Sequence, residues 1–492
     1  MDKPRIAVID DQLSQRKTEY IQFLSEKFDV VYISSESNLS KVYEKDIEML
    51  IIDLVLDGWK ESTENILDRV LSHNEYLPII MVSQYWEYDS VKPIIRNMLD
   101  LKIQYKVLLF LSWKEIATAK TNDDLLELII MDWKNRIYNE FSLYQQKYPK
   151  LLNHNESIKL LQIADMQFGA ETDPSADADR YIIAKRLKED SWVPNIVAIC
   201  GDISQSGKES EFHEAQEWID KFSRTLLPKR YEDIKYLVTV GNHDCNFDAF
   251  SQYYYESEFN KPSVEFKERK DMKGEEIWND PKRKISIESV VFSNYISFAD
   301  NLSSTYASFY KKSHLNIVND FFLNWGIRII HLNTLDMISP KNTVSVGIND
   351  KDRLEIVEHC VNNTRTPKVF TIIISHHGPD CFGYHGDNGE RWLRMQTFIT
   401  NVGAKLWLCG HNHKTDINVI EIDPSNSNKN IPYAVANSLR LHADSRYYGA
   451  PIGYNNIELI RNNGVVEKIK ITFHNIIDPS KYYDKEYDVN YN

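Results

Sequence analysis

The sequence is poor in cysteine. Its 492 residues include five cysteines, at positions 200, 245, 360, 381 and 409, and no two of them form a Cys-x-x-Cys pair. The odd number and the wide spacing exclude a disulfide scaffold and a zinc knuckle. They favour a reducing compartment, where thiols stay free.

Long apolar runs and a targeting segment are also missing. No stretch approaches the roughly 18 consecutive apolar residues that are needed to span a bilayer. The first residues, MDKPRIAVIDD, enter a strand-like segment directly and lack a basic region followed by an apolar one. We therefore expect a soluble, cytoplasmic protein with no membrane partner.

Basic charge is in deficit. The chain has 58 Lys and Arg residues against 72 Asp and Glu residues, which gives a formal net charge of -14. This balance argues against a protein that coats nucleic acid with a broad basic surface. It leaves a nucleotide or a nucleic acid open as a substrate, because bound metal ions would add positive charge that the count omits.

What the sequence does contain is two successive α/β patterns. In residues 1–118, amphipathic segments alternate with short runs rich in β-branched residues, at 5–9, 29–33, 48–52, 78–82 and 106–110. Strands that alternate with helices predict a parallel sheet covered by helices on both faces. The expected fold class is therefore α/β, with this sheet as the first domain.

Residues 119–156 are expected to form a helical connector. Within 121–149, apolar residues from Leu126 to Tyr148 recur at alternating steps of four and three, which predicts one long helix with an apolar seam. Two interpretations fit this seam. It packs on its own domain, or it forms a homodimer or carries a signal between domains.

The second α/β pattern covers residues 157–475. Its apolar runs end abruptly in polar residues, as in IKLLQIAD, NIVAICGD, KYLVTVGNHD, IRIIHLNT, VFTIIISHH and AKLWLCGHNH. Buried strands of α/β sheets deliver functional side chains at their carboxyl ends in this way. Residues 246–325, rich in aromatic and charged residues, are expected to form a cap over the site, and residues 476–492 a polar tail.

The residues that follow these runs have the chemistry of metal ligands. They offer carboxylates, amide oxygens and imidazoles: Asp165, Gln167, Asp202, Asn242, His376, His411 and His413. This mixture suits borderline divalent ions such as Mn, Fe, Zn or Ni. Two metal ions held about 3.5–4 Å apart are clamped by ligands on both sides. Asp202, at the end of a central run, is the natural bridge between them.

The order of motifs, D-x-Q, GD, GNHD, SHH and GHNH, resembles that of the calcineurin-like metallophosphoesterase family over residues 157–475. The resemblance implies a four-layer αββα domain that hydrolyses a phosphodiester or phosphomonoester with water activated between two metal ions. It also implies ligand roles. Asp165 and His413 would hold the first metal, Asn242, His376 and His411 the second, and Asp202 both.

Other residues are assigned to catalysis or to substrate by the same resemblance or by their place in the sequence. His243 would protonate or stabilise the leaving oxygen, with Asp244 orienting its imidazole. His377 is a candidate pocket residue, with a core position as the alternative. His385 and Arg391, in the loop between the last two ligand motifs, are candidate substrate contacts.

One residue departs from the family pattern. Where the family has the histidine of D-x-H, this chain has Gln167. A glutamine oxygen is a neutral and weaker donor than imidazole, so the first metal should bind more weakly, or the site should prefer an ion content with oxygen ligands. Manganese is favoured for this reason. An inactive descendant with one empty site is the alternative.

The first domain carries an acidic cluster of its own. Asp10 and Asp11 follow the first run, Asp53 ends the third, and Ser83 ends the fourth. Such acids at adjacent strand ends make an oxygen-only pocket suited to Mg²⁺. The pattern resembles response-regulator receiver domains, which are flavodoxin-like. It implies that Asp53 accepts phosphate from a histidine kinase, with Asp10 and Asp11 as Mg²⁺ ligands and Ser83 as the switch hydroxyl.

Receivers also carry a lysine at the end of the last strand, and here Lys106 stands at the start of the run 106–110. A receiver-like domain that takes no phosphate is therefore the alternative. For the whole chain we expect a dinuclear phosphoesterase, regulated by the first domain, that acts on a nucleotide or nucleic acid. The rival is a weakly catalytic or non-catalytic signalling protein that binds a partner in response to phosphorylation.

Overall fold

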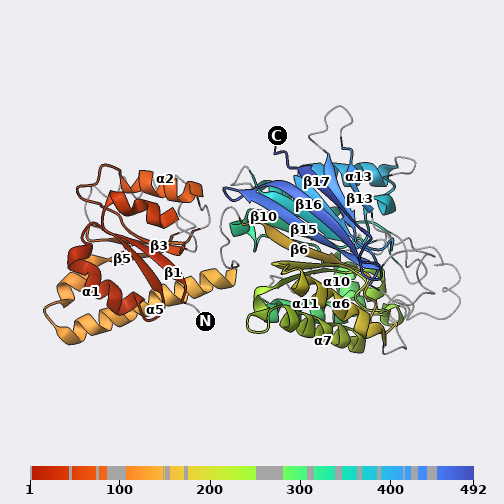
Figure 1. Cartoon of the computed structure of the whole chain (residues 1–492), viewed down its shortest axis with the longest axis horizontal. Coiled ribbons are helices and arrows are strands. Elements are labelled where there is room, and N and C mark those ends of the chain that lie inside the picture. Colours follow the sequence, from red (N-terminus) through yellow and green to blue (C-terminus); the bar gives the residue numbers. More distant parts are fainter. Residues whose placement is uncertain are drawn as a thin grey trace, which may run out of the picture. The chain divides into compact units, whose positions relative to one another are not determined.

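The protein folds into two compact units, Met1–Glu156 with Leu323–Trp325, and Ser157–Phe322 with Gly326–Asn492 (Figure 1). We refer to them as the N-terminal and C-terminal units. The computed structural model describes residues 3–43, 47–73, 77–85, 107–147, 149, 156–170, 175–250, 281–306, 315–336, 338, 346–362, 368–384, 389–413, 416–422, 430–439 and 452–491. Within these ranges, no helix combines the length and the apolarity needed to cross a membrane.

The N-terminal unit contains a five-stranded parallel sheet with the order β2-β1-β3-β4-β5. Its strands are β1 (Arg5–Ile9), β2 (Asp29–Ile33), β3 (Ile47–Asp53), β4 (Ile79–Ser83) and β5 (Val107–Ser112). This order is that of flavodoxin-like folds. The predicted fold class is confirmed, and each expected run forms a strand, although β5 continues two residues further to Ser112.

Helices cover both faces of this sheet. They are α1 (Leu13–Leu24), η1 (Glu36–Tyr43), α2 (Thr63–His73), α4 (Trp113–Ala119) and α5 (Asp123–Lys147). Side chains alternate along a strand, so Leu50 and Ile52 of β3 join one core and Met49 and Ile51 join the other. Each core is a separate hydrophobic cluster with its own helices.

Helix α5 packs on its own unit. Trp133, Ile137 and Phe141 of the predicted seam are buried in the core that also contains residues of α1 and α4. The other side of α5 is apolar as well, because Leu128 and Leu143 are 58% and 56% exposed. The seam is therefore used inside the unit, and a homodimer would have to use the opposite side.

The C-terminal unit contains two six-stranded sheets. One has the order β17-β16-β15-β6-β7-β8 and the other β13-β14-β12-β11-β10-β9. The strands are β6 (Ile158–Ile163), β7 (Ile196–Cys200), β8 (Lys235–Thr239), β9 (Ile317–Asn319), β10 (Ile327–Leu332), β11 (Phe370–Ser375), β12 (Ala404–Cys409), β13 (Asp416–Ile420), β14 (Ile431–Val435), β15 (Gly453–Asn462), β16 (Val465–Asn475) and β17 (Tyr482–Asp488).

Helices lie outside the two sheets and give four layers, αββα (Figure 1). The first sheet is covered by α6 (Ser175–Glu189), α7 (Glu209–Leu226), α10 (Pro281–Val291) and α11 (Ser293–Tyr306), and the second by α12 (Asp350–Asn362) and α13 (Glu390–Asn401). Short 3-10 turns of this unit are η2 (Tyr231–Asp233), η3 (Asn242–Asp244) and η5 (Pro379–Phe382), whereas η4 (Leu323–Trp325) belongs to the N-terminal unit.

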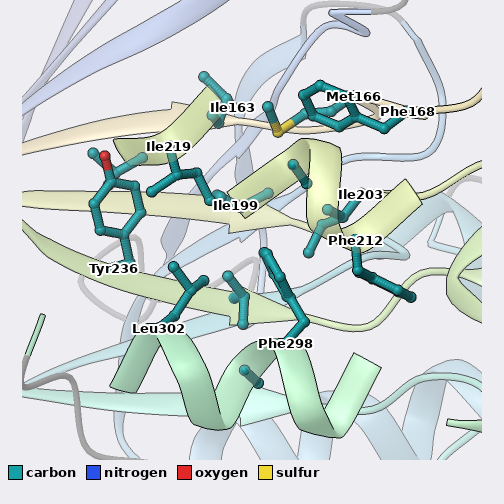
Figure 2. Close-up of a cluster of buried hydrophobic side chains, with 14 of the residues drawn as sticks. Ile163, Met166, Phe168, Ile199, Ile203, Phe212, Ile219, Tyr236, Phe298 and Leu302 are labelled. Carbon is teal, nitrogen blue, oxygen red and sulfur yellow. The ribbon is translucent and has the colours of Figure 1, made fainter. Parts of the chain in front are cut away.

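Part of the segment expected to form a cap belongs to this helical layer instead. Phe298 and Leu302 of α11 pack with Ile199, Phe212 and Tyr236 in the core beneath the first sheet (Figure 2). The reason is that the apolar residues of α11 share one face of the helix, which must be buried. Other parts of the insertion, 251–280 and 307–314, lie outside the described residues.

The expected polar tail contains an edge strand. Strand β17 pairs antiparallel with β16, from Lys468 opposite Asp488 to His474 opposite Tyr482. Its residues are mostly exposed and charged, which is typical of edge strands that avoid further pairing.

A buried amide ties the two sheets together. Gln162 of β6 donates through Nε2 to the carbonyl oxygens of Cys409 (3.0 Å) and Ala434 (2.8 Å) in the other sheet. Asn455 of β15 donates to Gln162 Oε1 at 2.9 Å. Because buried polar groups need their partners, these bonds fix how the strand ends of the two sheets meet.

Candidate metal centre

Loops that follow five strands meet at one edge of the C-terminal unit. Asp165 and Gln167 follow β6, Asp202 follows β7, and Asn242 begins η3 after β8, while His376 follows β11 and His411 and His413 follow β12. Parallel strands of one sheet end at the same edge, and here the edges of two sheets face each other. These side chains, far apart in sequence, therefore surround one small volume.

His376 is the centre of one group of ligand atoms. Its Nε2 lies 3.3 Å from Asp202 Oδ2, 3.1 Å from Asn242 Oδ1 and 3.2 Å from His411 Nδ1. One N–H cannot satisfy three acceptors, so this convergence fits a cation better than a proton. These are residues to which the resemblance gives the role of second-metal ligands, a role that stays a prediction.

Asp165 is the centre of the other group. His413 Nε2 lies 3.3 Å from Asp165 Oδ1, an oxygen that is buried without a hydrogen bond. The backbone N–H of His411 donates to Asp165 Oδ2 at 3.1 Å. Ligand atoms of Asp165, Asp202 and His376 all lie within 4.8 Å of one another, so Asp202 stands between the two groups. The residues present fit two divalent cations.

Backbone strain is concentrated in these loops. Among the described residues, seven non-glycine residues have a positive φ, and five of them are expected ligands: Asp165, Gln167, Asp202, His411 and His413. Each such residue costs about 1–3 kcal/mol and persists only where its surroundings impose it. Gln167 keeps this conformation (φ 48°) and is 1% exposed, so its loop retains the form of a ligand loop although the side chain differs.

Two motif glycines are required by close packing around Asp202 and His376. Gly201 has φ 80°, and a Cβ there would lie 2.6 Å from His376 Nδ1. A Cβ on Gly241 would lie 2.2 Å from the Asp202 backbone nitrogen. The glycines of GD and GNHD therefore let the ligand loops approach one another.

Asp202 and His376 stabilise each other's charge. Burial lowers the pKa of His376, but the Asp202 carboxylate raises it more, to about 9. Burial would raise the pKa of Asp202, and the neighbouring His376 holds it well below its usual range. His376 Nδ1 donates to the Cys200 carbonyl oxygen at 2.9 Å, which aims Nε2 at the ligand cluster.

His243 lies beside the cluster and is held by backbone groups. Its own N–H donates to Asp202 Oδ1 at 2.8 Å, and its Nδ1 lies 2.8 Å from the Gln205 carbonyl oxygen. A carbonyl can only accept, so Nδ1 carries a proton and Nε2 is left for a substrate. No motif in the sequence pointed to Gln205.

The sequence predicts that Asp244 orients the His243 imidazole, and the hydrogen bonds described for Asp244 are to the loop around it. Its carboxylate accepts hydrogen bonds from the backbone N–H groups of Ser204 and Gly241, both at 2.8 Å. Burial, and then the charge of Asp202, raises the pKa of Asp244 to about 7. Its position therefore supports the loop that carries His243 and Asn242.

Two of the three candidate substrate contacts lie within the described residues. His377 is fully buried, its Nδ1 lies 2.7 Å from Thr334 Oγ1, and its ring centroid lies 4.3 Å from that of His411. Burial, followed by the charges of His376 and His411, lowers its pKa. Arg391 is exposed at the start of α13, and His385 lies outside the described residues. Ligand nitrogens of His376, His377 and His411 also lie within 4.8 Å of one another, so both alternatives for His377, a pocket residue and a core residue, stay predictions.

The acidic cluster of the N-terminal unit also forms. Asp10, Asp11 and Asp53 have carboxylate oxygens within 4.8 Å of one another. Burial, and then the charge of Asp10, raises the pKa of Asp53 to about 7. Ser83 is buried at the end of β4 opposite Ser112, and its Oγ accepts from the N–H of Tyr85 at 3.0 Å.

Arg16, which the sequence analysis did not single out, lies in this pocket. It forms ion pairs with Asp10 and Asp53. A signal was present, because Leu13, Arg16, Tyr20 and Phe23 share the buried side of α1. A charged residue in an apolar stripe needs a buried partner.

Two sheets enclosed by helices, with a two-cation ligand set at their common edge, define a metallophosphoesterase-type domain. A family model of the calcineurin-like phosphoesterases matches residues 158–415, more than half of the chain. The chain belongs to this family, a class of metal-dependent phosphoric ester hydrolases.

Several solved structures are similar to parts of this chain. A purple acid phosphatase from yellow lupin seeds has 13% identity and a TM-score of 0.39, over 68% of this chain and 55% of that one. The chain thus spans about half the length of that phosphatase. Phosphopantetheinyl hydrolase from Mycobacterium tuberculosis has 12% identity and a TM-score of 0.27, over 60% and 94%.

For a response regulator receiver domain from Clostridium thermocellum the identity is 16% and the TM-score 0.21, over 29% of this chain and 96% of that one. A search of curated proteins gave no match.

Proposed function

We propose that the C-terminal unit hydrolyses a phosphodiester or phosphomonoester of a nucleotide or nucleic acid, with two divalent cations. The observation that carries the proposal is the convergence of Asp202 Oδ2, Asn242 Oδ1 and His411 Nδ1 around His376 Nε2, with Asp165 and its partner His413 alongside. The acceptors in this cluster outnumber the protons available to them, a deficit that two cations would remove.

Different residues of the chain would hold the two cations. Asp165, Gln167 and His413 would hold the first cation, Asn242, His376 and His411 the second, and Asp202 both. Bound there, two cations supply the charge that activates water near neutral pH and neutralises phosphoryl oxygens. His243, fixed through Nδ1 by Gln205, would protonate the leaving oxygen from Nε2, which requires the imidazolium form with a proton on both ring nitrogens.

Manganese is the proposed metal. Asp165, Gln167, Asp202 and Asn242 would bring carboxylate and amide oxygens to the centre, and oxygen ligands suit manganese better than softer ions. Iron, zinc and nickel are the alternatives that imidazole ligands also accept.

A substrate panel tests the proposal. Full-length protein is loaded with Mn²⁺, its metal content is measured, and nitrophenyl esters, cyclic nucleotides, and single- and double-stranded DNA are offered in parallel. Two ions per chain and hydrolysis of at least one class support the proposal. Fewer than two ions, with no hydrolysis of any class, would instead support the non-catalytic signalling protein.

A regulatory role for the N-terminal unit is the second part of the proposal. Asp10, Asp53 and Ser83 gather at the carboxyl edge of its sheet, as the receiver resemblance implies. The receiver resemblance predicts transfer of phosphate to Asp53 by a histidine kinase, and the alternative is a receiver-like domain that takes no phosphate. A cytoplasmic location stays a prediction. A homodimer through residues 121–149 also stays a prediction, which light scattering of a Leu128→Lys variant checks.

A further inference from the structure

The acidic pocket of the N-terminal unit already contains a cation. Arg16 Nη1 lies 3.0 Å from Asp10 Oδ2 and 2.5 Å from Asp53 Oδ2, so a single nitrogen joins the two carboxylates. Its Nη2 donates to Gln84 Oε1 at 3.1 Å. Arg16 is 6% exposed, and Asp10 and Asp53 are buried as well.

We propose that Arg16 takes the place of the divalent ion in this receiver-like pocket, so that the N-terminal unit is complete without Mg²⁺ and takes no phosphate on Asp53. Mg²⁺ requires near-octahedral oxygen ligation and keeps several waters. The oxygens that it would need from Asp10 and Asp53 are those that face Arg16. The pocket therefore does not fit Mg²⁺ unless the guanidinium leaves.

The end of strand β5 explains why the positive charge of the pocket comes from Arg16 on α1. The receiver resemblance implies a lysine at the carboxyl end of β5, but there the strand ends in Leu111 and Ser112, with Ser112 opposite Ser83. Lys106 lies outside the described residues and precedes β5. With no lysine at the end of β5, Arg16 supplies the positive charge of the pocket. Its guanidinium is charged at all relevant pH values and can bind two carboxylates at once.

Packing holds Arg16 in place. Its Cζ lies 4.9 Å from the centroid of the Trp113 ring, at the start of α4, which is within cation–π range. Tyr20 Oη donates to Asp10 Oδ2 at 2.9 Å and fixes the partner carboxylate. A buried guanidinium with two carboxylates cannot be removed without leaving uncompensated charge, so it acts as a structural part of the pocket.

The same contacts connect the pocket to α5. The Trp113 ring lies 5.3 Å, between centroids, from that of Trp133 on α5 and 5.0 Å from that of Tyr20. Displacement of Arg16 would therefore change the environment of Trp113 first. This inference is independent of the phosphoesterase proposal, because it concerns only residues of the N-terminal unit.

Magnesium binding tests the proposal on the full-length chain. Mg²⁺ is titrated by calorimetry, and thermal unfolding is followed with and without Mg²⁺, for the unchanged chain, Asp53→Asn, Arg16→Gln and the double variant. The C-terminal unit is common to all four, so its contribution cancels. We expect the unchanged chain and Asp53→Asn to respond alike to Mg²⁺.

Removing the guanidinium should open the pocket. We expect Arg16→Gln to bind Mg²⁺ at least ~10-fold more tightly than the unchanged chain, since a repelling charge a few ångströms away is lost. Adding Asp53→Asn should abolish that gain. Arg69→Gln is the matched control, because Arg69 is a surface arginine of the same unit that pairs with Glu61, and it should behave as the unchanged chain.

Three results would overturn the proposal. The first is a Mg²⁺ site in the unchanged chain that Asp53→Asn removes. The second is a folded Arg16→Gln chain with no gain in Mg²⁺ binding. The third is a phosphorylated species, formed by the unchanged chain with acetyl phosphate and Mg²⁺ and seen on a phosphate-affinity gel, that Asp53→Asn abolishes. If Arg16→Gln does not fold, the first and third comparisons decide the matter.

Discussion

The two units each gather aspartates at the carboxyl ends of parallel strands, but they balance the charge differently. In the N-terminal unit, Asp10 and Asp53 pair with the guanidinium of Arg16. In the C-terminal unit, Asp165 and Asp202 pair with the imidazoles of His413 and His376. An arginine keeps its charge at every relevant pH, whereas an imidazole can give up its proton.

The difference shows that an acidic cluster alone does not define a metal site. In the proposal, a fixed internal cation pairs with Asp10 and Asp53 and takes the place of an ion. Imidazoles that lose their protons become ligands themselves, so the C-terminal cluster is complete only when a metal replaces those protons. The partner of the aspartates, and not their number, separates the two pockets.

The largest effect is expected at Asp202, the carboxylate that both cations would share. Asp202→Asn should lower phosphoester hydrolysis by roughly 10³-fold or more and reduce the metal content, since one carboxylate stands between the two groups of ligands. Hydrolysis of a nitrophenyl ester and metal analysis check this. Asp233→Asn, a surface change in the same unit, is the control. Full activity in Asp202→Asn would remove the basis for a dinuclear centre.

The next effect separates chemistry from metal binding. His243→Asn should lower kcat by about 10²–10³-fold while two metal ions per chain remain, because His243 contacts the cluster through its backbone N–H and keeps its imidazole for the leaving group. His213→Asn, at an exposed position of α7, is the matched control. Loss of metal together with activity would place His243 among the ligands instead.

The pH dependence of metal binding should differ from that of a pocket balanced by arginine. The pKa of His376 is raised to about 9, so its proton must leave when a cation binds. Affinity should therefore rise about tenfold per pH unit from about 6.5 to 9 and then level off. Without metal, the folding stability changes with pH in the opposite direction. The His376–Asp202 pair stabilises the fold fully below about pH 6.5, and this contribution is lost as the pH rises through about 9.

Calorimetry in two buffers of different ionisation enthalpy checks the proton release. A release of no proton at pH 7 would contradict the proposed state of His376.

The smallest effect concerns the departure from the family pattern. Gln167→His should tighten binding of the weaker cation by about tenfold, since imidazole is the stronger donor and histidine accepts a left-handed backbone. Two-site titration with Mn²⁺ followed by electron paramagnetic resonance measures this. Gln205→His is the control, because Gln205 meets the site through its carbonyl oxygen. An unchanged first-site affinity would show that residue 167 does not coordinate.

Much of this arrangement could be predicted from the sequence. The strands of both units follow apolar runs, and the motif aspartates, Asn242 and the histidines come directly after them. A position at the end of an apolar run is a local property, so it can be recognised without knowledge of the tertiary fold. The departure at Gln167 is visible in the same way.

Other features depended on neighbours that are distant in sequence. Arg16 is an ordinary residue of a helix until α1 packs over the end of β3, and only then does it meet Asp53. Asp244 follows His243 directly, yet its carboxylate faces Ser204 across the loop. Part of the expected cap belongs to the helical layer instead, because the apolar face of α11 packs against a sheet.

By itself, the sequence determined which strands carry ligands and in what order, because burial of apolar runs and the chemistry of the residues after them are local. Only the tertiary structure decided which charges meet. Ion pairs act over a few ångströms, and distance along the chain does not set that separation. The packing of α1 brings an arginine to one acidic pocket, and the packing of the two sheets brings imidazoles to the other.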